Sequence, residues 1–253
     1  MQIVVPMSGL GQRFIDAGYS TIKPLIEIES KPIIQHVIER FCPDDDYIFI
    51  CNKDHLKNTS LEKVLYSLRP KAKIISIEKH KLGPVFAVSQ AFNSLDMKKP
   101  TIVNYCDFSW RWDYTDFKDT VLNNKCDGCV ISYKGFHPHL IGDNLYASMT
   151  HRNNWMEEIQ EKFSFTKNKM DCYQSSGTYY FKNGRLIKKY FQQLLDKGDD
   201  INGEFYVSMI YEQMKQDDLK IYIYPISYFL QWGTPDDLKE YLYWSQYFFK
   251  NPK

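Results

Sequence analysis

The chain has 253 residues, of which 43% are hydrophobic and 25% are charged. At this length about 70% of the surface of the unfolded chain is buried on folding, which is enough for one large α/β domain. The 32 Lys and Arg residues are balanced by 31 Asp and Glu residues, which gives a net charge of +1. This balance provides no basic field to attract nucleic acid or an anionic membrane, so we expect neither as a partner.

The sequence opens with an apolar, strand-like run, 1–6, that contains no basic residue. No stretch of the sequence approaches ~18 uninterrupted apolar residues, the length of a membrane-spanning helix. These features predict a cytoplasmic protein. In that compartment we expect reduced cysteines, including Cys126 and Cys129, because this pair lacks the second pair or the histidines of a zinc site.

Apolar runs of strand length alternate with segments of helical spacing over the first half of the chain. We predict strands at 3–5, 47–51, 73–77, 101–106 and 129–133, and helices over 32–41 and 84–95. Such alternation is typical of a parallel sheet with helices on both faces, since crossovers between parallel strands are right-handed.

The second half of the chain contains shorter, mixed segments. We predict strands at 144–150, 156–161, 177–181 and 220–229, and helices over 186–195, 204–214 and 235–248. This pattern predicts an antiparallel extension of the same sheet, with the last helix packed on the body. No Gly/Ser linker interrupts the chain, so we expect a single domain over 1–253.

The strongest motif follows the first predicted strand. Met7 and Ser8 lead into a Gly-x-Gly loop, Gly9 to Gly11, which is followed by Arg13. Glycines let backbone N–H groups approach a phosphate, and a guanidinium group can bond two phosphate oxygens. The loop lacks the third glycine of the dinucleotide fingerprint and the Gly-Lys-Ser/Thr of the Walker loop. It is therefore predicted to bind phosphate in a different setting.

Lys23 is the next cation of interest, and it directly precedes Pro24. A proline disfavours helix at the residue before it, so we expect an extended chain at Lys23 that turns the ammonium group back toward the glycine loop. Lys31 also precedes a proline, but a surface position is the better interpretation there.

Further segments occur in an order that resembles the GT-A-type nucleotidylyltransferase family, which contains sugar-phosphate and cytidylyl transferases. They are 80–87 (HKLGPVFA), 104–107 (NYCD), 158–163 (EIQEKF), 176–181 (SGTYYF) and 233–238 (GTPDDL). The resemblance spans nearly the whole chain. It implies a three-layer α/β/α Rossmann-like fold with a mixed, mainly parallel sheet. It also implies transfer of a nucleotidyl group from a nucleoside triphosphate to a small phosphorylated acceptor, with release of pyrophosphate.

The resemblance assigns roles to individual residues. Arg13 and Lys23 would stabilise charge around the triphosphate, Asp107 would hold Mg²⁺, and Lys162 would grip the acceptor phosphate. Such in-line transfer needs charge stabilisation and positioning rather than a protein nucleophile. The expected nucleotide-binding residues, in the half 1–136, are Met7, Ser8, Gly9, Gly11, Gly83 and Pro84. The expected acceptor-binding residues, with the half 137–253 shaping that pocket, are Lys162, Ser176, Gly177, Glu204, Trp110 and Arg111.

The sequence also departs from the family pattern. Gln231 stands where many members have an Asp as a second metal ligand, so the metal would rest on Asp107, phosphates and water, or use Asp236. Two other departures lie in segments that set specificity, at Phe163 and at Pro84-Val85.

Two aromatic or histidine-rich segments are less specific. His137 and His139 could serve a metal or a substrate, although a solvated loop is the better interpretation. Trp110, Trp112 and Tyr114 follow the predicted metal ligand closely. They either line or cover the acceptor pocket or pack under the sheet, and both interpretations stay open.

Within the family the chain most resembles the capsule-pathway cytidylyltransferases that join CTP to L-glutamine phosphate, giving CDP-L-glutamine for a phosphoramidate decoration. A sugar 1-phosphate nucleotidylyltransferase using UTP, dTTP or CTP is the alternative. A non-catalytic nucleotide-binding relative would fit Gln231 but not the retained cations. A GT-A glycosyltransferase would need an Asp-x-Asp motif, which Asp107 and Ser109 do not supply. Whether the chain forms a homo-oligomer stays open.

Overall fold

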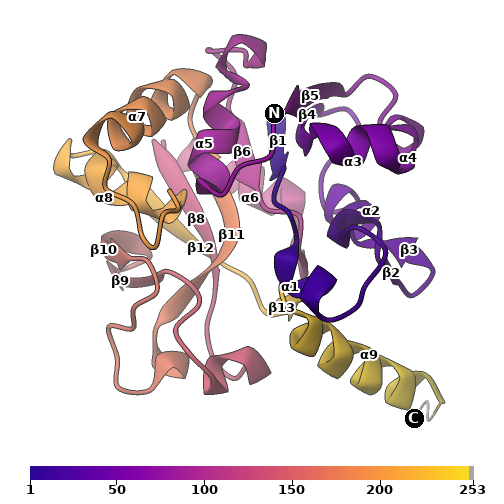
Figure 1. Cartoon of the computed structure of the whole chain (residues 1–253). Helices are drawn as coiled ribbons and strands as arrows, with labels where there is room; N and C mark the ends of the chain where they lie inside the picture. The colour runs from indigo at the N-terminus through magenta and orange to yellow at the C-terminus, as the bar shows by residue number, and fades with distance from the viewer. Residues whose placement is uncertain (251–253) are drawn as a thin grey trace.

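Strand β1 (Gln2–Met7) lies inside a nine-stranded sheet in the computed structural model, which describes residues 1–250 (Figure 1). Its side chains alternate between two cores: Ile3 and Val5 point to one face of the sheet and Val4 to the other. All three are fully buried. A strand covered on both faces reads as a continuous apolar run, which is why this segment stands out in the sequence.

The nine strands follow the order β5-β4-β1-β6-β11-β8-β12-β10-β9. The parallel pairs are formed by β1, β4 (Asp46–Asn52), β5 (Lys73–Ile77), β6 (Thr101–Asn104), β8 (Gly128–Tyr133) and β12 (Ile221–Pro225). The antiparallel pairs involve β9 (Ser148–Arg152), β10 (Trp155–Gln160) and β11 (Tyr173–Phe181). The predicted mixed, mainly parallel sheet with an antiparallel extension is confirmed.

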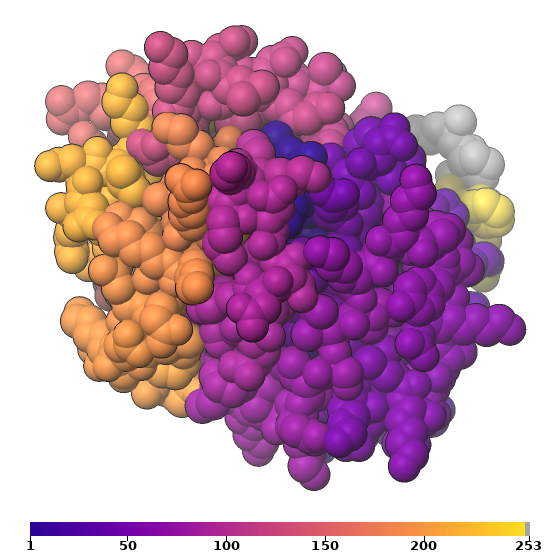
Figure 2. Space-filling view, turned by 90° about the horizontal axis from the view of Figure 1, so that it is seen from above, coloured from indigo at the N-terminus to yellow at the C-terminus, as the bar shows by residue number. Residues whose placement is uncertain are grey.

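Strand β11 joins the two halves of the sheet. It runs antiparallel to β6 on one side, with Thr178 opposite Asn104, and antiparallel to β8 on the other. Seen from above, the first half of the chain in purple and the helices of the second half in orange lie side by side (Figure 2). The halves therefore share one sheet.

Helices cover both faces of this sheet. Helices α5 (Gly83–Ser89), α7 (Gly184–Lys197) and α8 (Ser208–Gln216) contribute buried side chains to the core that contains Val4. Helices α2 (Ile33–Ile38), α4 (Leu61–Leu68) and α6 (Tyr114–Asn123) contribute to the core that contains Ile3. The predicted three-layer α/β/α arrangement is confirmed.

Local signals fix the ends of these helices. The side chain of Asn183 accepts a hydrogen bond from the backbone N–H of Leu186 at the start of α7, and Gly198 ends the helix with a left-handed φ of 72°. Asp113 caps α6 in the same way, accepting from the N–H groups of Thr115 and Asp116. Such caps satisfy N–H groups that have no partner within the helix.

Several predicted segments differ in the structure, and the strand predicted at 144–150 begins only at Ser148. The segment 220–229 is divided into β12 and β13 (Tyr228–Gln231), and β13 pairs with β7 (Phe108–Arg111) in a separate two-stranded sheet. The helix predicted over 204–214 begins only at Ser208, because the backbone of Phe205 is bonded to Leu82 and Val85. The helix predicted over 84–95 ends at Ser89 and continues as the 3-10 turn η2 (Phe92–Ser94).

Helix α9 (Pro235–Lys250) extends from the body beside the N-terminal segment (Figure 1). Leu238 packs into a third core with Phe14 and Trp232. The same core holds Ile28 of β2 (Glu27–Ile28), which pairs with β3 (Lys31–Pro32). No helix among residues 1–250 is long and apolar enough to cross a bilayer.

Candidate active site

A cavity of about 850 Å³ opens beyond the carboxyl ends of β1 and β6. Ligands of open α/β sheets bind at this edge, because loops from neighbouring strands converge there. Residues from both halves of the chain line the cavity. The predicted site residues among them are Met7, Ser8, Gly9, Gly11, Arg13, Lys23, Gly83, Pro84, Asp107, Lys162, Ser176, Gly177 and Glu204.

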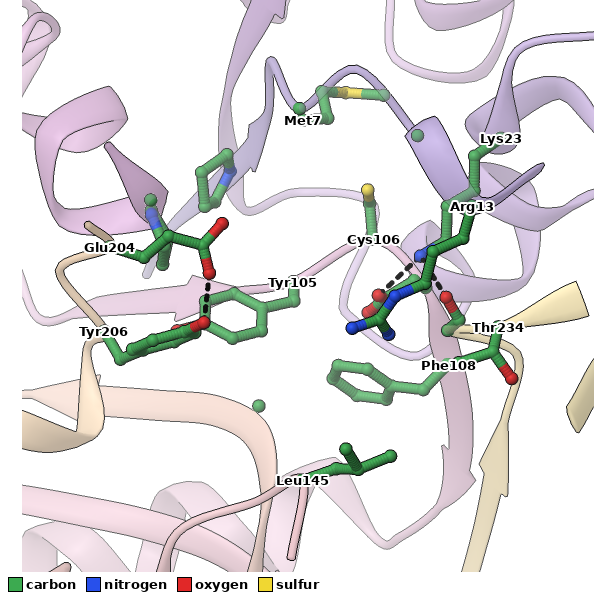
Figure 3. A pocket seen from close by; sticks show the side chains of 18 of the residues that line it. Met7, Arg13, Lys23, Tyr105, Cys106, Phe108, Leu145, Glu204, Tyr206 and Thr234 are labelled. Carbon is green, nitrogen blue, oxygen red and sulfur yellow. Dashed lines mark hydrogen bonds and ion pairs between the residues drawn. The ribbon is translucent and has the colours of Figure 1, made fainter. Parts of the chain in front are cut away.

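The glycine loop forms one wall of this cavity. Gly11 adopts a left-handed φ of 66° and precedes the short helix α1 (Gln12–Asp16). Phe14 is buried in the third core, whereas the side chain of Arg13 extends into the cavity (Figure 3). The predicted glycine loop therefore presents a guanidinium group to the space in which a ligand would lie.

Lys23 reaches the same space from beneath the loop. Its Nζ donates hydrogen bonds to Asp107 Oδ2 at 2.7 Å and to the carbonyl oxygen of Gly233 at 3.0 Å. The prediction of an extended chain at Lys23 is wrong: Lys23 begins a 3-10 turn, η1 (Lys23–Leu25), and Ile22 is the extended residue. The ammonium group still lies in the cavity, because Pro24 is buried and fixes the turn against the body.

Asp107 follows β6 and is the carboxylate nearest to Lys23. Its side chain is 29% exposed, and its backbone carbonyl oxygen accepts a hydrogen bond from the backbone N–H of Trp232. Mg²⁺ is commonly held by one or two carboxylates together with substrate phosphates and water, so a single carboxylate facing the cavity fits a metal that arrives with a triphosphate. Within residues 1–250, no three His, Cys, Asp or Glu side chains converge on a common metal position.

The expectation that Asp236 could supply a second metal ligand is wrong. Its side chain is 95% exposed at the start of α9 and lies near Lys239. Gln231 lines the cavity, and its amide nitrogen would lie 2.5 Å from a Cβ built on Gly233. The neighbouring Asp237 accepts a hydrogen bond from the Thr234 hydroxyl at 2.6 Å.

The loop before α5 connects the two halves. The N–H of Phe205 donates to the carbonyl of Leu82 at 3.0 Å, and the N–H of Val85 donates to the carbonyl of Phe205 at 3.1 Å. Gly83 has a φ of 80°, and a Cβ there would lie 2.8 Å from the backbone N and O of Phe205. Only glycine fits this close approach without strain.

His80 in this loop bonds the glycine loop. Its Nδ1 accepts from the N–H of Leu82 at 3.2 Å, so its Nε2 carries the proton and donates to Ser8 Oγ at 2.9 Å. Burial lowers the pKa of His80, which favours this neutral form. The Ser8 hydroxyl is then left to donate its own proton.

The opposite end of the cavity carries Lys162 and a group of hydrogen-bonded polar side chains beside it. Lys162 Nζ donates to the Tyr206 hydroxyl at 2.8 Å, and the Tyr206 hydroxyl donates to a carboxylate oxygen of Glu204. Glu161 accepts from the Ser208 hydroxyl. Burial raises the pKa of Glu161 to about 7, although Ser208 and Lys162 act in the opposite direction. Figure 3 shows Glu204 and Tyr206 facing Arg13 and Lys23 across the cavity.

Sequence reasoning assigned no role to Glu161, Tyr206 or His80, although Glu161 and His80 lie in the segments 158–163 and 80–87 that resemble the family. Glu161 directly precedes Lys162, and Tyr206 lies two positions after Glu204. Their positions beside predicted site residues were therefore a further indication of a role in the sequence. Ser176 lines the cavity as predicted, but its hydroxyl donates to the carbonyl of Ile131 at 2.8 Å.

Solved structures share this architecture. A nucleoside-diphosphate-sugar pyrophosphorylase from Vibrio cholerae RC9 matches with a TM-score of 0.77 over 95% of this chain and 99% of its own, at 18% identity. The inositol-1-phosphate CTP transferase from T. maritima matches with a TM-score of 0.74 over 99% of this chain and 96% of its own, at 12% identity. A UDP-glucose pyrophosphorylase complexed with UDP-glucose matches with a TM-score of 0.73 over 98% of both chains, at 13% identity. The chain has the GT-A nucleotidyltransferase fold. No protein-family model and no curated protein matches the sequence.

Within the GT-A nucleotidyltransferase fold of this chain, Trp110 and Arg111 do not line the cavity, which corrects their predicted place in the acceptor pocket. Both belong to β7, where neighbouring side chains point to opposite faces. Trp110 is 1% exposed and packs against Phe41 and Phe108, whereas Arg111 lies exposed at the end of the strand.

Trp112 and Tyr114 also pack under the sheet rather than over the cavity. Their rings contact Phe117 of α6, with the Trp112 ring centroid 4.8 Å away. This arrangement decides between the two interpretations left open by the sequence.

The histidines of the 137–139 segment are partly buried, so the prediction of a solvated loop is wrong. His139 shares a hydrogen bond of 2.8 Å with the Tyr133 hydroxyl, and burial lowers the pKa of His139 to about 3. Both histidine rings pack near Phe229 of β13. They support the wall of the site that carries Tyr146.

Proposed function

We propose that this chain transfers a nucleotidyl group from a nucleoside triphosphate to a small phosphorylated acceptor, with release of pyrophosphate. One observation carries this proposal: a single cavity holds Arg13, Lys23 and Asp107 at one end and Lys162 at the other. A pair of cations at one end and a separate lysine at the other suit two phosphorylated substrates that must meet. The GT-A nucleotidyltransferase fold supports the same conclusion.

In the proposed reaction, an acceptor phosphate oxygen attacks the α-phosphorus in line. A new P–O bond forms as the bond to the β-phosphate oxygen breaks, and pyrophosphate leaves with the electron pair. Arg13 and Lys23 stabilise the negative charge that develops on the triphosphate, and Lys162 orients the incoming phosphate. Mg²⁺ held by Asp107 would neutralise phosphate charge when bound. No protein nucleophile is required.

The nucleotide is proposed to lie against the glycine loop and the loop before α5. This assigns Met7, Ser8, Gly9, Gly11, Gly83 and Pro84 to nucleotide binding. The half 1–136 then binds nucleotide and the half 137–253 supplies most of the acceptor site, including Ser176, Gly177 and Glu204.

We favour CTP as the donor and L-glutamine phosphate as the acceptor, giving CDP-L-glutamine in the cytoplasm for capsule modification. The acceptor end supports an acceptor with an ammonium group as well as a phosphate, because Glu161 and Glu204 face the cavity beside Lys162. The α-carboxylate of L-glutamine phosphate also needs a cation, and Arg111, which was predicted to bind the acceptor, lies outside the cavity. Lys81, which does line the cavity, is the replacement we propose.

The alternative acceptor is a sugar 1-phosphate, used with UTP, dTTP or CTP. The Tyr206 hydroxyl and the carboxyl groups of Glu161 and Glu204 could equally bond sugar hydroxyls. Two of the similar structures carry sugar-nucleotide pyrophosphorylase activity in their names.

The test is pyrophosphate release with Mg²⁺ from CTP, UTP, dTTP, ATP and GTP, each paired with L-glutamine phosphate and with a panel of sugar 1-phosphates. We expect release with CTP and L-glutamine phosphate. Release only with a sugar phosphate would favour the alternative acceptor. Nucleotide binding without release for any pair would overturn the proposed transfer and favour a non-catalytic relative.

A further inference from the structure

Tyr146 carries a buried hydroxyl at the wall of the cavity. Its side chain is among those lining the cavity, yet its oxygen is shielded from water and has no hydrogen-bond partner within residues 1–250. A buried hydroxyl without a partner costs about 1–3 kcal/mol of stability. Native proteins satisfy most such groups, so an unsatisfied one at a ligand cavity calls for a functional explanation.

The charged neighbours of this hydroxyl belong to both ends of the site. Asp107, Asp237 and Arg13 act on it electrostatically from the triphosphate end, and Glu161 acts from the acceptor end. Burial and these carboxylates raise the pKa of Tyr146 well above its usual value. The group therefore stays protonated and can donate a hydrogen bond across the physiological pH range.

The ring of Tyr146 is held in place from behind. It makes edge contacts with Tyr133, His139 and Phe229, at centroid distances of 6.3, 5.2 and 6.2 Å. His139 is fixed in turn by its hydrogen bond to Tyr133. On the cavity side, the segment 142–145 is exposed and lies outside any helix or strand. Leu145 points into the cavity from this segment (Figure 3). Because the hydroxyl is shielded in the ligand-free protein, a ligand in the cavity reaches it only when neighbouring side chains shift.

We propose that the Tyr146 hydroxyl donates a hydrogen bond to a phosphoryl oxygen at the point where the acceptor phosphate meets the α-phosphate. This inference rests on the proposed nucleotidyl transfer. It makes Tyr146 a catalytic residue that contacts substrate, and it gives the His137–His139 segment a positioning role behind the ring. Phosphate contact supplies the partner that the hydroxyl lacks in the ligand-free protein.

The decisive variant is Tyr146→Phe, which keeps the ring and removes only the hydroxyl. A donor to a charged group that strengthens in the transition state is worth about 10- to 100-fold in turnover. We therefore expect kcat to fall about 10- to 100-fold, with KM for the triphosphate changed less than about twofold. Because an unsatisfied group is removed, Tm should stay the same or rise by about 2–6 °C.

The matched control is Tyr224→Phe. That hydroxyl donates to Asp116 at 2.6 Å, outside the cavity, so its removal should lower Tm and leave kcat unchanged. Turnover by Tyr146→Phe equal to that of the unmodified protein would overturn the inference. So would a joint loss of Tm and turnover, since that pattern indicates a structural role.

A binding measurement separates this inference from the proposed function. If the unmodified protein releases no pyrophosphate with any substrate pair, the proposed function fails. Calorimetric titration with CMP, whose single phosphate corresponds to the α-phosphate, then decides the role of Tyr146 as a phosphoryl ligand. Weaker binding by Tyr146→Phe supports the contact, and equal binding by both proteins overturns it.

Discussion

Lys23 Nζ and Asp107 Oδ2 lie 2.7 Å apart, so the proposed triphosphate-binding cation and the proposed metal-binding carboxylate neutralise each other in the ligand-free protein. The pair is half-buried, with side-chain exposures of 16% and 29%. A triphosphate with its metal would replace both partners at once, giving phosphate to Lys23 and Mg²⁺ to Asp107. Nucleotide and metal are therefore expected to bind together.

Lys23→Met tests this exchange. Turnover should be lost, because no ammonium group then meets the triphosphate. Binding of Mn²⁺ without nucleotide should instead tighten by about fivefold, since the ion pair that competes for Asp107 is worth about 1 kcal/mol. Electron paramagnetic resonance of free Mn²⁺ measures this directly. Asp107→Asn should lose both turnover and Mn²⁺ binding, and retained activity in either variant would remove the assigned role.

Glu161 should make stability depend on pH. Its pKa is about 7 in the folded protein against 4.5 for the unperturbed group, so between these values the folded state binds more protons than the unfolded state. The stability of the unmodified protein then falls as pH rises through this window and is level above it. The free energy of unfolding of Glu161→Gln, compared with that of the unmodified protein, should therefore increase by up to about 3 kcal/mol as pH rises from 5 to 8.

Urea unfolding at four pH values between 5 and 8 measures the Glu161 effect. Glu158→Gln is the matched control, because Glu158 is exposed on the same strand β10. The difference in free energy of unfolding between this variant and the unmodified protein should not change with pH. If the difference in free energy of unfolding for Glu161→Gln also does not change with pH, the Glu161 carboxyl group is not held in a buried setting.

Gly83→Ala should be strongly destabilising. The added Cβ meets the backbone of Phe205 at 2.8 Å, in addition to the strain of a φ of 80°. Gly198→Ala is the matched control, since its φ is 72° and nothing lies within 4 Å of the added Cβ. We expect about 1 kcal/mol of destabilisation for the control and about 2–4 kcal/mol for Gly83→Ala. Equal losses in thermal or urea unfolding would contradict the close approach of the two loops.

His80→Phe should weaken nucleotide binding. The phenyl ring keeps the packing against Phe86 but cannot donate to Ser8, so KM for the triphosphate should rise by roughly five- to tenfold, a value typical of one lost hydrogen bond. In the unmodified protein the same KM should be level from pH 8 down to about 6.5 and rise only below it, because burial lowers the pKa of His80 and keeps Nδ1 as an acceptor.

His151→Phe is the control for the His80 prediction, since His151 is exposed on β9 and lies outside the cavity. Steady-state kinetics of both variants across pH 5.5 to 8 measures the effect. An unchanged KM for His80→Phe would remove Ser8 from nucleotide recognition.

The sequence by itself determined the features that depend on neighbouring residues. The alternation of buried strands and helical segments predicted the three layers, since a strand covered on both faces must be apolar throughout. The glycine loop with Arg13 and the Lys23-Pro24 step could be found from local chemistry, whereas Asp107 and Lys162 could be found because their segments resemble those of the nucleotidylyltransferase family. The structure brings these four side chains to one cavity.

Only the tertiary structure decided the features that depend on distant segments. Trp110 does not lie in the predicted acceptor pocket, because β7 pairs with β13 and the Trp110 side chain is buried in the core. Helix α9 begins at Pro235, so Asp236 lies in its first turn, where its side chain is exposed to solvent. The segment at Phe205 is not helical because it bonds the loop before α5. The pairing partner of a strand such as β7 and the direction of its side chains are set by packing between elements, and the local pattern of residues does not encode them.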